Sequence, residues 1–185
     1  MKNIFLFFFL VFTVLSLSAQ SQLIVRINSA DDDQEEFLTG SSNPVGNIDV
    51  GSSDLKLGSE STDGSSPQLV GLRFTNIDLP QGAQIASAYI QFTIDEADKN
   101  DDPASFTIAA EAADKPTSFT AEAFNISARP TLDQTITWEV PAGSWTDGAG
   151  IAGPDQRTPN LSSLVQELVD RDGWEAGNAM VFTIQ

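Results

Sequence analysis

The sequence predicts an all-β protein, an antiparallel β-sandwich of jelly-roll type with one short helix near residues 159–171. Several short segments alternate apolar and polar residues, as strands do when they bury one face. Clusters of Gly, Pro, Ser and Asp separate these segments, as turns do. Only one segment has apolar residues at helical spacing. The 185 residues suffice for one domain, and seven or more such strands indicate two facing sheets.

The first residues have the features of an export signal. Lys2 precedes an almost unbroken apolar run over 4–17, and the small residues Ser18 and Ala19 follow it. A positive start, an apolar run and small residues are typical of a signal peptide. The run is shorter than the ~20 apolar residues of a membrane span. We therefore expect a signal peptide over 1–19, a β-sandwich domain over 21–185, no membrane span in the mature chain, and a secreted or cell-surface location.

The first half of the mature chain predicts strands of unequal clarity. Leu23, Val25 and Ile27 alternate with other residues, which predicts a first strand. An acidic stretch over 31–36 is expected to be a loop, and the strand pattern over 38–67 is weak. The weak strand candidates are 47–50 and 54–57. Val70, Leu72 and Phe74 then predict one face of a clear strand over 70–74.

The second half gives stronger strand signals. Residues 88–94 form the cleanest alternating segment, and a second acidic loop follows over 95–103. Three more alternating segments are expected to be strands: 106–110, 136–140 and 180–184. Because the sequence stops at Gln185, inside the last of these, we expect a domain truncated at its C-terminal end, with a poorly protected strand at the sheet edge.

One segment predicts a helix. Leu161, Leu164, Val165 and Leu168 fall at i, i+3, i+4 and i+7, so they form a single apolar stripe. Thr158 or Asn160 precedes the stripe at a position that suits an N-cap. We expect this helix to pack across the open end of the sandwich.

Composition excludes several functions. The chain has 9 Lys and Arg against 26 Asp and Glu, a formal charge of −17, and neither Cys nor His. Thiol catalysis, disulfides, Cys/His zinc sites and histidine general bases are therefore excluded. Nucleic acid is not expected as a partner, because phosphate binding requires clustered basic residues.

Several runs of residues carry a resemblance to a known family. These are LRFTNI at 72–77, PQGAQI at 80–85, AYIQF at 88–92 and PNLSSLVQELVDR at 159–171. The chain resembles secreted bacterial jelly-roll modules similar to the carbohydrate-binding-like, DNRLRE-type domains of multidomain exported proteins. The similarity covers residues 23–184 and includes no catalytic motif. It implies a polysaccharide-binding role beside catalytic or adhesion domains, and the pattern of such modules continues past the last strand seen here.

The acidic stretch is a candidate metal site. Asp31, Asp32, Asp33 and Glu35 lie close together in sequence, and clustered carboxylates repel one another unless a cation screens them. Calcium takes six to eight oxygen ligands, so these residues are candidates for a structural Ca²⁺ site. The spacing does not match the helix-loop-helix calcium pattern. The alternative is a solvated acidic loop.

Two tryptophans are candidates for carbohydrate binding. Trp145 lies in a segment of loop composition and Trp174 follows the expected helix. Exposed rings bind sugars by stacking against their C–H faces. The alternative is that both rings close the end of the sandwich. Trp138, in phase with Ile136 and Val140, is expected in the core.

These observations lead to three hypotheses about function. The first is a non-catalytic extracellular module that binds polysaccharide or supports a neighbouring catalytic domain. The second is a structural or adhesive module of a cell-surface protein without a sugar site. The third, a carboxylate-based glycoside hydrolase, requires a cleft holding two carboxylates whose pKa values differ. We expect no enzyme, since the sequence singles out no such pair.

Overall fold

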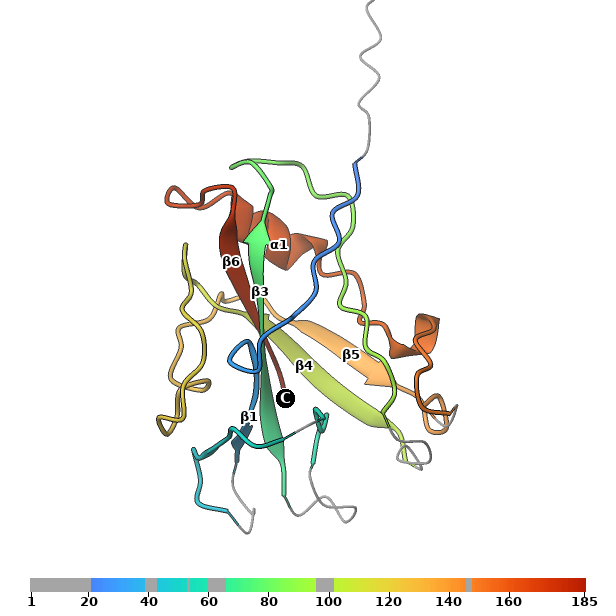
Figure 1. Cartoon of the computed structure of the whole chain (residues 1–185). Coiled ribbons are helices and arrows are strands. Elements are labelled where there is room, and N and C mark those ends of the chain that lie inside the picture. Colours follow the sequence, from blue (N-terminus) through green and yellow to red (C-terminus); the bar gives the residue numbers. More distant parts are fainter. Residues whose placement is uncertain (1–20, 39–42, 53, 60–65, 96–101, 146–147) are drawn as a thin grey trace, which may run out of the picture.

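The computed structural model describes residues 21–38, 43–52, 54–59, 66–95, 102–145 and 148–185. Six strands form one antiparallel sheet in the order β2-β1-β3-β6-β4-β5 (Figure 1). The elements are β1 (Asp33–Phe37), β2 (Ile48–Asp49), β3 (Gln68–Ile77), β4 (Ala104–Ala110), β5 (Ile136–Val140), the 3-10 turn η1 (Pro154–Gln156), α1 (Ser162–Val169) and β6 (Asn178–Ile184). The predicted all-β class with one short helix is confirmed.

The strand register gathers the apolar side chains on one face, called here the front face. Leu72 on β3 lies opposite Phe182 on β6, and Ile184 lies opposite both Val70 and Ile108. Residues directly opposite one another share a face, so the alternating positions of β3, β4, β5 and β6 all contribute to one core. That core includes Leu72, Phe106 and Trp138, with Phe92 packed against it.

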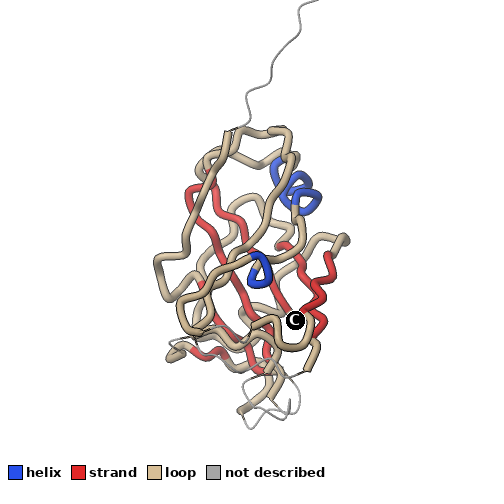
Figure 2. Tube along the Cα trace, turned by 90° about the vertical axis from the view of Figure 1, so that its right-hand side faces the viewer, coloured by secondary structure: helices blue, strands red, loops and turns tan. Residues whose placement is uncertain are grey.

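The layer over the front face consists of extended segments and α1 (Figure 2). Within residues 85–94, the N–H of Phe92 donates to the carbonyl of Gln156 at 2.9 Å, and that of Ile94 to Ile151 at 2.9 Å. An isolated bridge joins Gln91 to Arg157. The expected strand over 88–94 is therefore an extended segment paired along one edge. It completes a sandwich-like arrangement without a second regular sheet.

Helix α1 packs as its sequence predicts, but it spans Ser162–Val169 and is shorter than the expected 159–171. Its apolar stripe is buried, with Leu164 at 0% and Leu168 at 1% exposure. Asn160 Oδ1 accepts the N–H of Ser162 at 3.0 Å, which satisfies one of the unpaired donors of the first turn. Thr158, the other expected cap, instead accepts the N–H of Ile90 at 2.9 Å. Asn160 Oδ1 also accepts the N–H of Ala88 at 3.0 Å, so both polar side chains connect the start of the helix to the extended layer.

Three expectations for the first half are wrong, and the third concerns the weak strand at 54–57. Residues 23–27 form no strand, and the expected acidic loop over 31–36 contains β1. The reason is that acidic side chains of β1 find donors on other segments. The Glu36 carboxylate accepts the N–H groups of Ile126 at 2.9 Å and Ser127 at 2.8 Å on the back of the sheet. Of the two weak strands, only Ile48–Asp49 forms one; 54–57 does not.

The last strand occupies the middle of the sheet. β6 pairs with β3 on one side and β4 on the other, so the expected exposed edge at residues 180–184 is wrong. Residues 1–20, where the signal peptide is expected, lie outside the described residues. Within the described ranges, no helix is long and apolar enough to cross a membrane.

Candidate functional site

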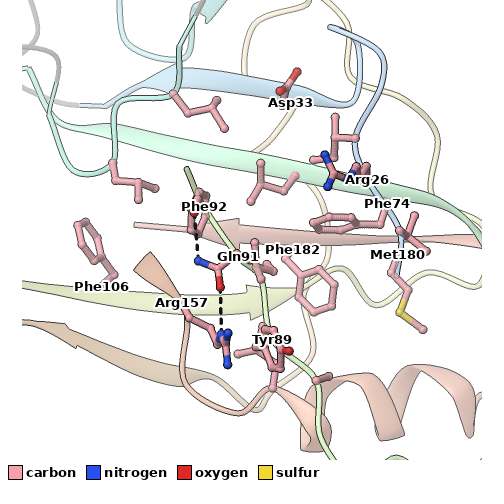
Figure 3. A pocket seen from close by; sticks show the side chains of 18 of the residues that line it. Arg26, Asp33, Phe74, Tyr89, Gln91, Phe92, Phe106, Arg157, Met180 and Phe182 are labelled. Atoms are coloured by element: carbon pink, nitrogen blue, oxygen red, sulfur yellow. Dashed lines mark hydrogen bonds between the residues drawn. The ribbon is translucent and has the colours of Figure 1, made fainter. Parts of the chain in front are cut away.

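A partly open cavity of about 2960 Å³ lies between the front face of the sheet and the segments that cover it. Residues 21–30 and 83–95 form two of its walls, and residues 54–59 close one end. Aromatic and aliphatic side chains of β3, β4 and β6 line its floor (Figure 3). They are Leu72, Phe74, Phe106, Met180 and Phe182. Four of these five side chains are buried and belong to the core, and only Phe74 is partly exposed.

One end of the cavity is polar. Glu35 on β1 lies opposite Val70 and Asp49 in the register, and its side chain is fully buried. Glu35 Oε1 accepts the N–H of Lys56, and the Ser52 hydroxyl also interacts with this carboxyl group. Gln68, 1% exposed, has no partner for either side-chain amide atom. Buried polar atoms are normally hydrogen-bonded, so the Gln68 amide is an exception. At 0% and 1% exposure, neither Glu35 nor Gln68 is accessible to a ligand in this structure.

Burial raises the pKa values of two carboxyl groups at this end. For Glu35, burial is the main cause and the nearby Asp49 carboxylate adds to it, while the N–H of Lys56 opposes it. For Asp33, burial raises the pKa, its own backbone N–H opposes the rise, and Asp32 adds to it. Carboxyl groups with raised pKa in a cleft are a feature of hydrolase sites. Here, however, Glu35 is 0% exposed, so a sugar polymer cannot reach it in this structure.

The four acidic residues predicted as a metal site have different surroundings. Asp31 is exposed, and Asp32 accepts from Arg73 Nη1 at 2.5 Å. Asp33 and Glu35 lie on the front face of β1, along the cavity. Within the described part of the chain, no three acidic side chains converge as metal ligands. Calcium binding therefore stays a prediction.

The two tryptophans predicted to bind carbohydrate lie against the core. Trp174 is 2% exposed, and its Nε1 donates to the carbonyl of Leu79 at 2.8 Å, so neither ring face is open in this structure. Trp145 is half-buried against Phe92 and Trp138, with ring centroids 6.1 and 5.9 Å away. Its Nε1 donates to the carbonyl of Asp155 at 2.9 Å. Only Trp145 retains accessible ring surface.

The structure also places an exposed ring at the rim of the cavity, which sequence reasoning missed. Tyr89 is 45% exposed, and the Arg157 guanidinium lies 4.2 Å from its ring centroid. Arg157 Nε donates to Gln91 Oε1 at 3.0 Å, and Gln91 Nε2 donates to the carbonyl of Phe92 at 3.1 Å (Figure 3). Gln91 Nε2 also donates to the carbonyl of Gly153 at 2.9 Å. The signal was the alternation over 88–94, which places Tyr89 and Gln91 on the outer side of a half-buried segment.

Comparison with known proteins gives no relative: no family model, curated protein or solved structure matches the chain. The resemblance to DNRLRE-type modules therefore stays a prediction from the residues that carry it.

Proposed function

We propose that the protein is a secreted or cell-surface, non-catalytic β-module that binds polysaccharide, with Tyr89 as the ring on which a sugar stacks. The observation that carries this proposal is the exposed Tyr89 ring supported by Arg157 at 4.2 Å. A cation over an aromatic face stabilises the position of the ring. The ring is thus held in place at the surface, as a stacking platform requires.

The polar groups beside Tyr89 suit recognition of sugar hydroxyl or carboxylate groups. Arg157 uses Nε to bind Gln91, while its two terminal amino groups have no hydrogen-bond partner among the described residues. A guanidinium donates well to carboxylates and hydroxyls. Gln91 fixes the guanidinium through hydrogen bonds to the backbone of Gly153 and Gln156. The same three side chains therefore supply a ring face and oriented donors.

Affinity electrophoresis tests the proposal. Gels containing neutral or uronic-acid polysaccharides of plant, algal or host origin should retard the wild-type protein. Tyr89→Ala should abolish the retardation and Arg157→Ala should weaken it. Ile151→Ala is the matched control, because Ile151 is a comparably exposed apolar residue at 42%. Retardation that persists in Tyr89→Ala, or its absence with every polysaccharide, would overturn the assignment.

A structural or adhesive module without a sugar site is the second candidate. Burial of Trp174 favours it, because a ring committed to packing at 2% exposure supports the domain and not a ligand. Such a module could also position a neighbouring catalytic domain. It predicts that the wild-type protein and Tyr89→Ala migrate identically in all the gels above.

A further inference from the structure

We infer that residues 21–28, called here the strap, form a movable cover that opens away from the front face while the sheet stays folded. The strap crosses the front of the sheet before the chain enters β1 (Figure 1). In the open state, apolar side chains beneath the strap become accessible. The motion is separate from the sugar site proposed at Tyr89, because the strap forms no hydrogen bond with Tyr89, Gln91 or Arg157.

The first observation is that the strap has no hydrogen bond to the rest of the described chain. Its backbone groups pair with no other described segment, and the bond from Asn28 Nδ2 to the Arg26 carbonyl, at 3.1 Å, stays within the strap. The other extended segment over the front face differs. There the N–H groups of Phe92 and Ile94 donate to carbonyls of residues 156 and 151 at 2.9 Å. Segments with few hydrogen bonds and few buried contacts open at a low cost in free energy.

Two apolar side chains hold the strap closed. Val25 and Ile27 are half-buried and pack against the front-face core, while Leu23 and Ile24 are 43% and 73% exposed. The cavity of about 2960 Å³ separates parts of the strap from the sheet, whereas protein interiors are close-packed. The contact between strap and sheet is therefore incomplete, and the free energy that opens the strap is small compared with that of unfolding the sheet.

The hinge of this motion is the turn over 29–32. The N–H of Asp32 donates to the Ser29 carbonyl at 3.0 Å, and the Asp31 carbonyl accepts the N–H of Phe119 at 2.9 Å. The Asp32 carboxylate also pairs with Arg73 on β3. From Ser29 onwards the chain is thus fixed to the sheet and to the back-face loop, so the opening ends at this turn.

Met180 on β6 is a suitable probe of the open state. It is 3% exposed, lies opposite Phe74 in the register and lines the cavity together with the strap. Figure 3 shows Met180 and Phe74 on the same side of the sheet as Arg26 of the strap. The next residue, Val181, is 0% exposed and belongs to the core on the back of the sheet. These two neighbours therefore become accessible through different motions.

Thiol labelling of single-cysteine variants tests the inference, because the chain has no cysteine of its own. We expect the thiol of Met180→Cys to react with a maleimide about tenfold or more faster than that of Val181→Cys without denaturant. Low concentrations of urea should hardly change the rate for Met180→Cys. They should raise the rate for Val181→Cys, because its exposure requires unfolding of the sheet. Equal rates with equal urea dependence would overturn the inference.

A second substitution separates opening of the strap from unfolding of the sheet. Gly71→Ala destabilises the sheet from its back face, where a Cβ would lie 2.7 Å from Phe119 Cζ. It should accelerate labelling of Val181→Cys by about tenfold and leave labelling of Met180→Cys unchanged. Equal acceleration of both thiols would contradict an independent strap.

Substitutions within the strap test what holds it closed. Ile27→Asp should accelerate labelling of Met180→Cys by about tenfold, because it removes a half-buried contact. Ile24→Asp is the matched control, since Ile24 is exposed on the same strap, and it should change the rate little. Equal effects of the two substitutions would contradict the assigned anchor.

Trypsin cleavage of the wild-type protein after Arg26 gives a measurement without any substitution. The rate of this cut should stay constant as urea is raised below the unfolding transition, because only local opening is needed. Circular dichroism verifies that each variant is folded. A cut after Arg26 that appears only as the sheet unfolds would overturn the inference, whatever the outcome of the polysaccharide gels.

Discussion

Arg129 and Glu111 form an ion pair behind the sheet, in which Nη1 donates to Oε2 at 2.9 Å. The two side chains are only 10% and 9% exposed. The same guanidinium donates to the carbonyls of Thr117 and Ser118 and lies 4.5 Å from the Phe119 ring centroid. One arginine therefore holds the loop over 116–130 against the end of β4.

Arg129→Ala is expected to destabilise the protein by about 3–5 kcal/mol, because it leaves the Glu111 carboxylate buried without its cation. The matched control is Arg171→Ala. Arg171 pairs with Asp114 at 2.6 Å, but these side chains are 32% and 41% exposed. An exposed pair contributes about 1 kcal/mol or less. Urea unfolding measures both values, and equal losses would contradict the distinction.

Gly71→Ala is expected to destabilise the protein by about 1–3 kcal/mol through overpacking. A Cβ at this position would lie 2.7 Å from Phe119 Cζ and 3.2 Å from Ile126 Cδ1, so the back-face loop would have to move. Gly148→Ala is the control, because nothing lies within 4 Å of a Cβ there. Thermal unfolding of the two variants compares them directly. Similar melting temperatures would show that the back-face loop can move to accommodate the added methyl group without a loss of stability.

Glu35 is expected to make stability fall as pH rises. Burial raises its pKa in the folded state above the ordinary 4.5, so the unfolded chain releases this proton first. The free energy of unfolding of the wild type, relative to Glu35→Gln, should therefore decline above pH 4.5 and level off beyond the folded-state pKa. Glu139→Gln reports the general effect of removing a carboxylate. If the free energy of unfolding of the wild type, relative to Glu35→Gln, rises with pH, the raised pKa of Glu35 is contradicted.

Leu164→Ala is expected to cost about 2–5 kcal/mol, since the side chain is fully buried beneath α1 and its removal leaves a cavity. Glu167→Ala, on the exposed side of the same helix, should change stability by about 0.5 kcal/mol or less. Chemical unfolding monitored by tryptophan fluorescence distinguishes them. A loss with Glu167→Ala as large as with Leu164→Ala would show that helix propensity, and not packing, decides the result.

The sequence predicted those elements whose burial pattern is set by their own side chains. Strict alternation identified β3, β4, β5 and β6, because each buries one row of apolar residues on the front face. Helical spacing identified α1 for the same reason. These elements could be predicted without knowing which segments they pack against.

The wrong assignments concern residues whose structure depends on distant partners. β1 contains Asp33, Glu35 and Glu36, which ordinarily disfavour a strand. It forms because its neighbours β2 and β3 supply pairing and because distant N–H groups donate to Glu35 Oε1 and Glu36 Oε2. Residues 23–27 have the strand pattern but lack a backbone partner in the described structure. Tyr89 was missed as a site residue because its partner Arg157 is 68 positions away in the chain.

The strand order has a consequence for how the molecule is made. β2, β1 and β3 form one half of the sheet and β4 with β5 the other, and among the strands of the described residues β6 alone pairs with both halves. During synthesis on the ribosome, both halves must wait for residues 178–184 before their inner edges are covered. Such high contact order slows folding. The front-face core therefore stays open until β6 has been made and has inserted between β3 and β4.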